Sequence, residues 1–231
     1  MSGVLVTATD TEVGKTFLAA AICARLRADG VAVVAHKPAV TGIDDPPPPG
    51  GRDHELLAAC TGQAPEEVAP RRYGPPVSPH LAADRAGAPL EPAKLVATAR
   101  DAGRTAEALV VEGIGGLLVP FTRDGYDVRA FAVDLGLPLV VAARPGLGTI
   151  NHVRLTVEAA HAGGLDVRAV VLTPWDGGDP LADDNRRTLS ELLDGVPVVV
   201  LPRCAPTPDA LAAAAAELPV ASWLGAPAPT R

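Results

Sequence analysis

The segment near the amino terminus restricts the possible folds of this chain more than any other. Residues 9–16 read TDTEVGKT; they follow an apolar run, Val4–Thr7, and precede a segment with helical apolar spacing, Thr16–Ala28. We expect a strand, a loop and a helix in that order. A Gly-Lys-Thr triplet in this context is typical of a phosphate-binding loop, whose backbone N–H groups and helix N-terminus hold phosphate oxygens. An ordinary strand–turn–helix is the alternative.

Two side chains of this loop suit phosphate chemistry. Lys15 supplies a cation, and the Thr16 hydroxyl is a ligand for Mg²⁺. Thr9 occupies the place where the common form of the loop has its first glycine, so the match is to a variant of the motif.

The remainder of the chain alternates apolar strands with helical segments. We expect strands at Val31–Ala35, Ala108–Val111, Pro138–Ala142, Val167–Leu172 and Val196–Leu201, and helices at Asp53–Cys60, Pro92–Ala106, Ala130–Leu135, Thr149–Ala162, Leu181–Leu193 and Pro208–Leu218. Several strands are continuously apolar, which is typical of a parallel sheet covered on both faces. The pattern predicts one α/β domain over residues 1–231: a doubly wound, mainly parallel sheet with helices on both faces, as in P-loop NTPases. We expect the last ten or so residues to be flexible.

Composition limits the partners of the chain. Its formal net charge of −7 provides no basic excess for nucleic-acid phosphates. No apolar run approaches the ~20 residues of a membrane span, and the amino terminus lacks the pattern of a signal peptide. We therefore expect a cytoplasmic protein that binds neither nucleic acid nor membrane. The three cysteines have no metal-ligand spacing and are expected to be reduced thiols.

Two further segments place charged residues where a sheet binds ligands. KPAVTG, residues 37–42, follows the second strand, and VEGIGG, residues 111–116, follows the third. Ligands of open α/β sheets lie beyond the carboxyl ends of the strands, so Lys37 is a candidate for stabilising phosphoryl charge and Glu112 for holding Mg²⁺. Taken alone, each would be a solvated strand end. Asp53 is either a plain helix cap or a third metal ligand.

Together these motifs resemble one family. TDTEVGKT, KPAVTG, the helix start at Asp53, VSPH, VEGIGG and LGTINH occur in the order and spacing found in dethiobiotin synthetases, from Val4 to about Pro202. The resemblance implies a Mg²⁺-dependent homodimer that joins 7,8-diaminononanoate, CO₂ and ATP to give dethiobiotin, ADP and phosphate in biotin synthesis. It also implies that no protein nucleophile is required.

The resemblance further implies roles for individual residues. Lys37 and Lys15 would be the catalytic cations, and Thr16, Asp53 and Glu112 the metal ligands. The diamino acid would contact Thr11, Thr41, Leu147, Gly148 and Asn151, of which the last three would come from the partner subunit. The nucleotide would contact Glu12, Val13, Gly14, Lys15, Thr16, Phe17, Asp53, Glu112, Gly113, Ile114, Gly115, Thr173, Pro174, Leu201, Pro202 and Arg203.

The chain departs from the family pattern in three places. Ala8 replaces a loop glycine, and the loop with Pro46–Pro49 is unlike that of a typical member. Thr173 and Pro174 stand where many members carry Asn and Asp for the base, which predicts relaxed nucleotide choice. Two other classes are alternatives to this family. Cobyrinic acid amide synthases carry a glutaminase domain that does not fit in 231 residues, and ParA/MinD-like ATPases carry an extra lysine in the loop where this chain has Thr9 and Asp10.

Overall fold

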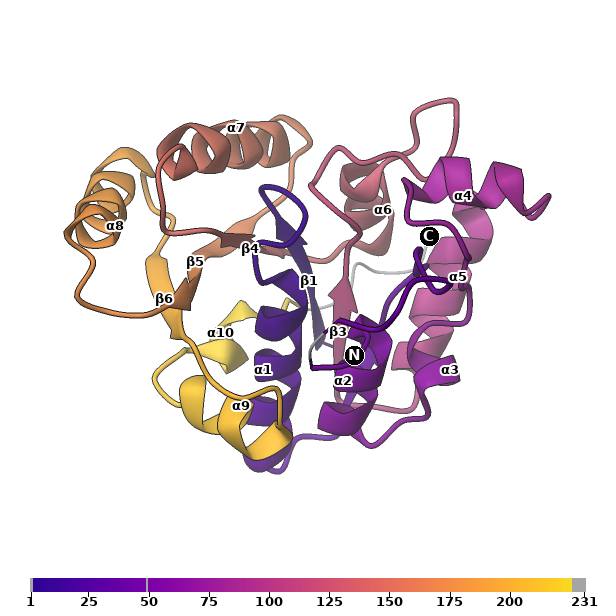
Figure 1. Ribbon diagram of the computed structural model, residues 1–231, viewed down its shortest axis with the longest axis horizontal. Helices are drawn as coiled ribbons and strands as arrows, with labels where there is room; N and C mark the ends of the chain where they lie inside the picture. Colours follow the sequence, from indigo (N-terminus) through magenta and orange to yellow (C-terminus); the bar gives the residue numbers. More distant parts are fainter. Residues whose placement is uncertain (1, 49, 226–231) are drawn as a thin grey trace.

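In this computed structural model, which describes residues 2–48 and 50–225, six strands form one sheet (Figure 1). The strands are β1 (Ser2–Ala8), β2 (Val33–His36), β3 (Ala108–Glu112), β4 (Leu139–Ala143), β5 (Val167–Trp175) and β6 (Val198–Pro202). Their order across the sheet is β2-β3-β1-β4-β5-β6, and every neighbouring pair is parallel. The predicted doubly wound α/β fold is confirmed. The predicted flexibility of the carboxyl terminus falls largely on residues 226–231, outside the described residues.

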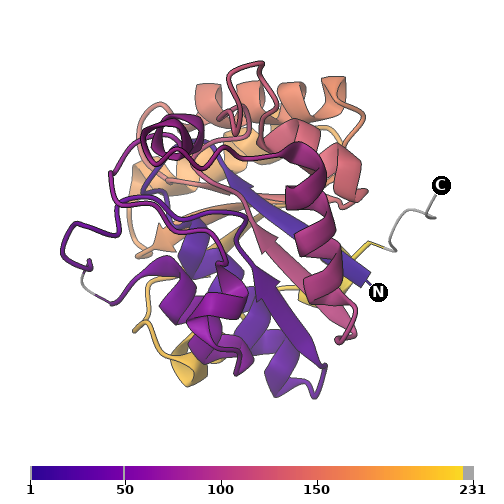
Figure 2. The same cartoon turned by 90° about the vertical axis from the view of Figure 1, so that its right-hand side faces the viewer.

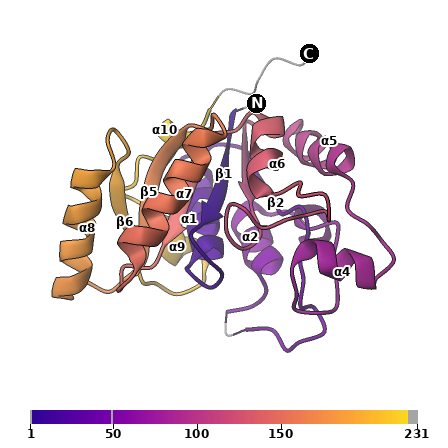
Figure 3. The ribbon, with the colours of Figure 1, turned by 90° about the horizontal axis from the view of Figure 1, so that it is seen from above.

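Helices cover both faces of the sheet (Figures 1 and 3). They are α1 (Lys15–Ala28), α2 (Asp53–Thr61), α3 (Pro65–Val68), α4 (Pro79–Arg85), α5 (Pro92–Gly103), α6 (Val128–Leu135), α7 (Thr149–Ala162), α8 (Pro180–Leu192), α9 (Pro208–Ala214) and α10 (Val220–Trp223). Helices α1, α2, α9 and α10 pack into one apolar core, and α5 to α8 pack into the other. No helix within the described ranges is long and apolar enough to cross a membrane.

The continuously apolar strands explain the two cores. Leu5, Leu109 and Leu139 point into the core beneath α5 to α8, whereas the residues next to them, such as Val4 and Val110, point into the core beneath α1. Because successive side chains of a strand face opposite sides of the sheet, a strand buried on both sides must be apolar throughout.

Some elements differ from the prediction. Helices α3, α4 and α10 were not predicted, and α9 ends at Ala214 rather than at Leu218. Both α3 and α4 begin with a proline, Pro65 and Pro79, which is favourable in the first turn of a helix because that turn lacks acceptors for its N–H groups anyway. The prolines in these segments favoured the prediction of loops where the structure has two short helices.

The strand order places a crevice beside β1. The chain passes from β1 to β2 on one side and later from β3 to β4 on the other, so the connections diverge at the carboxyl ends of β1 and β3. The connection between β2 and α2 lies on the opposite side of the molecule from the start of β1 (Figure 2). An antiparallel bridge between Gly3 and Gly225 lies at the amino-terminal end of β1.

Candidate active site

A cavity of about 680 Å³ opens at the carboxyl ends of β1, β2 and β3. Its wall consists of the loop before α1, the segment after β2, the first residue of α2, the start of α4 and the loop after β3. The chain has three lysines, and two of them, Lys15 and Lys37, line this one cavity. Its volume and its position at a strand-order switch are those expected of a small-molecule site.

The phosphate-loop geometry depends on Gly14. This residue precedes α1 with φ +86°, in the left-handed region that disfavours side chains, and a Cβ there would lie 2.8 Å from the Thr173 Cγ2 atom. Glu12 also has a positive φ, of 56°. The loop thus turns sharply and brings the first N–H groups of α1 toward the cavity, which is the arrangement that binds phosphate.

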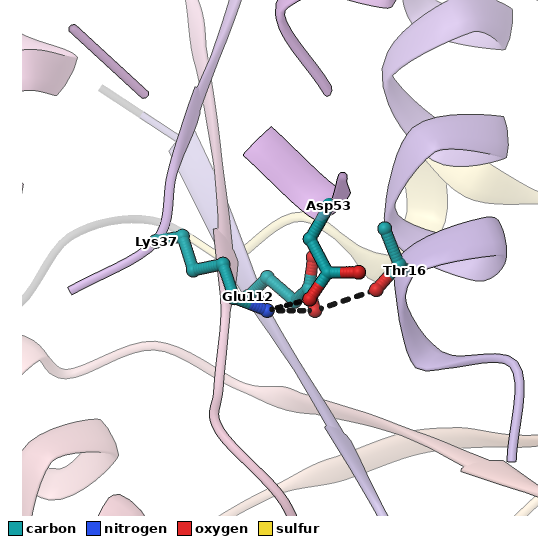
Figure 4. Close-up of polar contacts among 4 residues, drawn as sticks. All are labelled: Thr16, Lys37, Asp53 and Glu112. Carbon is teal, nitrogen blue, oxygen red and sulfur yellow. Dashed lines mark hydrogen bonds and ion pairs between the residues drawn. The ribbon is translucent and has the colours of Figure 1, made fainter. Parts of the chain in front are cut away.

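Lys37 reaches its carboxylate partners because of the sheet register. His36 of β2 pairs with Val111 of β3, so the next residues, Lys37 and Glu112, lie side by side. The Lys37 Nζ atom donates to Glu112 Oε1 at 2.5 Å and to Asp53 Oδ2 at 2.7 Å (Figure 4). Lys37 is 3% exposed and Glu112 is fully buried, so neither is a solvated strand end.

Asp53 and Thr16 complete this cluster from two helices. Asp53 is the first residue of α2, and its side chain pairs with Lys37 instead of capping the helix. The Thr16 hydroxyl, in the first turn of α1, donates to Glu112 Oε1 at 2.9 Å (Figure 4). Residues from four separate segments therefore meet at one point of the cavity edge. We call Thr16, Lys37, Asp53 and Glu112 the ion cluster.

Electrostatics keep Asp53 and Lys37 charged. Burial opposes ionisation of Asp53, but the Lys37 ammonium outweighs it and lowers the pKa of Asp53 to about 2. Burial likewise opposes the charge of Lys37, but Asp53 and Glu112 outweigh it and raise its pKa above the ordinary value. Lys15 differs, because burial, followed by the nearby charge of Lys37, lowers its pKa. The cavity therefore has a tightly held cation, Lys37, beside a less compensated one.

The oxygen atoms of the ion cluster suit a small hard cation. Glu112 Oε2 is buried and has no hydrogen-bond partner among the described residues, although a buried carboxylate oxygen is normally paired. It lies on the same carboxylate that accepts from Thr16. No group of three His, Cys, Asp or Glu side chains arranged for a metal was found in the described residues. Two carboxylates and a hydroxyl are nevertheless sufficient for Mg²⁺, which keeps waters and phosphate oxygens among its ligands.

The structure brings one group of the predicted site residues together around the cavity. These are Thr11, Glu12, Gly14, Lys15, Thr16, Phe17, Lys37, Thr41, Asp53, Ile114 and Gly115. Val13 and Gly113 do not line the cavity. Val13 is buried in the core of α1, and a Cβ at Gly113 would meet Val128 Cγ1 at 2.9 Å. The carboxylate of Glu112 joins the group through the ion cluster.

The residues predicted for the base lie elsewhere, at the ends of β5 and β6. Thr173 is 2% exposed and packs against Gly14 rather than toward solvent. The Arg203 guanidinium donates to both carboxylate oxygens of Asp176, at 2.6 and 2.9 Å, and the Arg203 N–H donates to Trp175. Leu201 is buried, and Pro202 is paired with Trp175 in the sheet. With Pro174, these residues remain predicted contacts of the base.

The predicted carboxylate-binding residues form a third location, the start of α7. Gly148 precedes the helix with φ +89° and without a side-chain cap. Leu147 is 91% exposed, and Leu147, Gly148 and Asn151 do not line the cavity of the same chain. The Thr149 N–H donates to the Gly146 carbonyl, so the N–H groups that follow it in the first turn of α7 are the ones available to a ligand from outside this chain's own cavity.

Sequence reasoning missed part of the cavity wall. Pro76, Val77, Ser78 and Pro79 line it, as does Val119. The stretch VSPH, residues 77–80, was among the motifs of the family resemblance, and its position after a Pro-rich connection was the available signal. Nothing in the sequence distinguished Val119 from a core valine.

The fold and the site define a nucleotide-binding α/β protein with a P-loop. Comparison with solved structures supports the α/β fold. An ATP complex of a Cyanothece McdA variant is 12% identical with a TM-score of 0.51, covering 96% of this chain and 92% of that one. The cell division ATPase MinD of Pyrococcus furiosus is 17% identical with a TM-score of 0.50, covering 87% and 84%. At these identities the likeness concerns the fold alone.

Sequence relatives narrow the class to a family. A family model described as an AAA domain matches residues 2–206. The ATP-dependent dethiobiotin synthetase BioD of Rhodococcus erythropolis is 38% identical over 202 residues, which cover 87% of this chain and 88% of the relative. BioD of an Anaeromyxobacter species is 44% identical over 173 residues, which cover 74% and 76%. The chain belongs to the dethiobiotin synthetase family.

Proposed function

We propose that this chain is an ATP- and Mg²⁺-dependent cyclo-ligase that converts 7,8-diaminononanoate and CO₂ to dethiobiotin, with release of ADP and phosphate, in biotin biosynthesis. The observation that carries the proposal is the ion cluster beside the phosphate loop, in a chain that belongs to the dethiobiotin synthetase family. Lys15, Lys37, Thr16 and Asp53 line one cavity, and the buried Glu112 carboxylate contacts Lys37 and Thr16 from behind its edge, which suits transfer of a phosphoryl group.

The proposed reaction needs positioning and charge stabilisation more than a nucleophilic side chain. One amine of the substrate takes up CO₂ as a carbamate. A carbamate oxygen attacks the γ-phosphorus of ATP and displaces ADP, which leaves a mixed anhydride. The second amine attacks the carbonyl carbon, closes the five-membered urea and expels phosphate. Negative charge develops on oxygen atoms in each step, and each amine loses a proton as its new N–C bond forms, so fixed cations and aligned reactants lower the barriers.

Each group of residues has a proposed task. The backbone of Glu12–Phe17 and the Lys15 ammonium hold the triphosphate, and Lys37, kept charged by its two carboxylates, faces the transferred phosphoryl group. Thr11 and Thr41 offer hydroxyls to the diamino acid from the cavity wall. Thr16, Asp53 and Glu112 would hold Mg²⁺, which supplies positive charge to the phosphates when bound.

Product analysis tests this function directly. The protein is incubated with ATP, Mg²⁺, bicarbonate and 7,8-diaminononanoate, and dethiobiotin and ADP are quantified by mass spectrometry. We expect one ADP for each dethiobiotin and no dethiobiotin when the diamine is omitted. Steady hydrolysis of ATP without dethiobiotin would overturn the proposal and would favour a ParA/MinD-like ATPase.

We further propose that the enzyme is a homodimer that pairs through the α7 face. Leu147, Leu118 and Leu155 are 91%, 53% and 57% exposed, and the last two line one surface hollow. Exposed apolar side chains gathered on one face favour a protein contact. A second copy there would also bring Leu147, Gly148 and Asn151 to a cavity that they do not line in their own chain.

The proposed dimer predicts a paired loss of assembly and activity. Replacing Leu118 and Leu155 together with glutamate should give a monomer in sedimentation equilibrium and should remove most of the activity. The matched control is Leu181→Glu, an exposed leucine on α8 that is 43% exposed. A wild-type monomer with full activity would contradict the proposal.

A further inference from the structure

One buried polar side chain lies outside the cavity and has a specific set of contacts. Asn185 is on the core-facing side of α8 with Ala182 and Leu189, and it is 6% exposed. Its Nδ2 atom donates to the carbonyl oxygens of Pro145 at 2.8 Å and Gly146 at 3.2 Å. An apolar residue is the usual occupant of such a position, and a buried amide is costly without hydrogen-bond partners, which these two carbonyls supply.

The two carbonyls belong to the loop that starts α7. The Gly146 oxygen also accepts from the N–H of Thr149, the first residue of the helix. The loop contains Gly146 and Gly148 and has no side-chain cap of its own, so little within it fixes its conformation. Asn185, located 40 residues away in sequence, therefore anchors the loop at the oxygen that also pairs with the helix start.

Chemistry explains why the anchor is an asparagine. Backbone carbonyls only accept hydrogen bonds, and an amide nitrogen has two hydrogens to donate to two of them. An aspartate of the same shape would place acceptors against acceptors, and a leucine of similar volume would leave both carbonyls without this partner.

We propose that Asn185 is a positioning residue for the diamino acid: it holds residues 145–148 so that the N–H groups of the first turn of α7 beyond Thr149 present a fixed site to the substrate carboxylate. This inference rests on the proposed function, in which the α7 start binds that carboxylate. Asn185 itself contacts no substrate. Its removal should weaken binding of the carboxylate end of the substrate and leave the nucleotide site unchanged.

The test separates positioning from stability. We compare wild type with Asn185→Leu and with Leu189→Ala, which removes packing from the same buried face of α8 without touching the loop through hydrogen bonds. The KM for 7,8-diaminononanoate should rise about tenfold in Asn185→Leu, the effect of one net hydrogen bond. The KM for ATP should stay within about twofold, because the nucleotide site has no contact with Asn185.

A second substrate isolates the carboxylate. The diamine 2,3-diaminononane has a methyl group in place of the carboxylate. With it, kcat/KM should change less than about twofold between wild type and Asn185→Leu, because this diamine cannot bind the start of α7 through a carboxylate in either protein. An equal loss with both diamines, or an equal rise of the KM for ATP, would overturn the proposal. The same KM increase in Leu189→Ala at a similar Tm would do so too.

A second variant covers the case in which Asn185→Leu does not fold, and the wild-type assay tests the proposed function separately. If Asn185→Leu does not fold, Asn185→Ser is used, which keeps one donor but is too short to reach both carbonyls, and the same ratios apply. Failure of wild type to form dethiobiotin would refute the proposed function before any variant is compared. Normal wild-type activity with unchanged ratios in the variants would refute only the role of Asn185.

Discussion

The two halves of the sheet end in different kinds of loop. The carboxyl ends of β2, β3 and β1 carry Lys37, Glu112 and the phosphate loop, which converge with Asp53 around a single cavity. The ends of β4, β5 and β6 carry glycines, prolines and buried or ion-paired side chains, which do not line that cavity. One half presents opposed buried charges, and the other presents mainly backbone.

This difference indicates separate roles for the two halves of the sheet. Charges that act on phosphate must be fixed and desolvated, so the protein compensates them with one another inside the ion cluster. Recognition of a carboxylate or a base can use backbone groups, whose positions are set by loops. We therefore expect substitutions in the first half to affect chemistry and stability, and those in the second half to affect affinity and selectivity.

Removal of Lys37 is the strongest test of the first half. We expect Lys37→Met to lower kcat by about 10²-fold or more, because a cation aimed at developing phosphoryl charge contributes about 3 kcal/mol to the barrier. Steady-state kinetics measure the rate, and nucleotide titration measures affinity, which should change much less. The control is Lys94→Met, the third lysine of the chain, which pairs with Glu91 at the surface.

The fold of Lys37→Met needs its own check. The substitution leaves Asp53 and Glu112 without their cation, and breaking a buried pair costs several kcal/mol of stability. Thermal unfolding must therefore show a folded variant at the assay temperature. Turnover within a few-fold of wild type in that folded protein would mean that Lys37 serves structure alone.

Acid should lower the free energy of unfolding of the protein in two separate windows of pH, through two side chains of the first half of the sheet. His36 is fully buried, and burial, followed by the charge of Arg71, lowers its pKa from 6.5 to about 4. Between these values the unfolded chain binds a proton that the folded chain does not, so the free energy of unfolding falls as pH drops from 6.5 to 4, by up to roughly 3 kcal/mol. Asp53, whose folded pKa is about 2 against 3.8 otherwise, adds stability above pH 4 that is lost as pH falls toward 2.

Denaturant titrations at pH 7, 5.5, 4 and 3 measure the free energy of unfolding across both windows. His36→Leu should flatten the loss between pH 6.5 and 4 and leave the loss below pH 4 in place. His161→Leu, near the exposed end of α7, is the control and should keep the wild-type profile. An unchanged slope in His36→Leu would show that another group titrates in this window.

The fold was predictable from the sequence because its signals are local. The run Val4–Thr7, the Gly-Lys-Thr start of α1 and the strand at Val167–Leu172 each depend on neighbouring residues, and their alternation with helices fixed the class. Helix α4 was not predicted, because the proline-rich segment that precedes it has the composition of a loop.

The arrangement of the site was predictable only in part. Lys37 and Glu112 were identified as strand ends near a ligand, but their direct pairing depends on the register of β2 against β3, across 75 residues of sequence. The sequence allowed two roles for Asp53, a helix cap or a metal ligand. In the structure its carboxylate forms an ion pair with Lys37. Asn185 gave no sequence signal, since its partners are backbone carbonyls of a distant loop.

Nucleotide choice tests the second half, where we expect the smallest effect. Thr173 is buried against Gly14, Pro174 lacks an N–H, and Arg203 is held by Asp176, so the side chains at the ends of β5 and β6 have little left to offer a base. A nucleotide site without hydrogen-bonding groups specific for one base discriminates weakly between nucleoside triphosphates.

The triphosphate should then provide most of the affinity, through residues 12–17 and the ion cluster. We expect GTP, CTP and UTP to support turnover with kcat/KM within about 10²-fold of ATP at saturating diamine. Inorganic tripolyphosphate, which has no base, should compete with ATP with an inhibition constant within about tenfold of the KM, since the loss corresponds to roughly one hydrogen bond. If ATP is preferred beyond 10²-fold and tripolyphosphate competes poorly, groups at the ends of β5 and β6 must read adenine, and the contrast between the two halves fails.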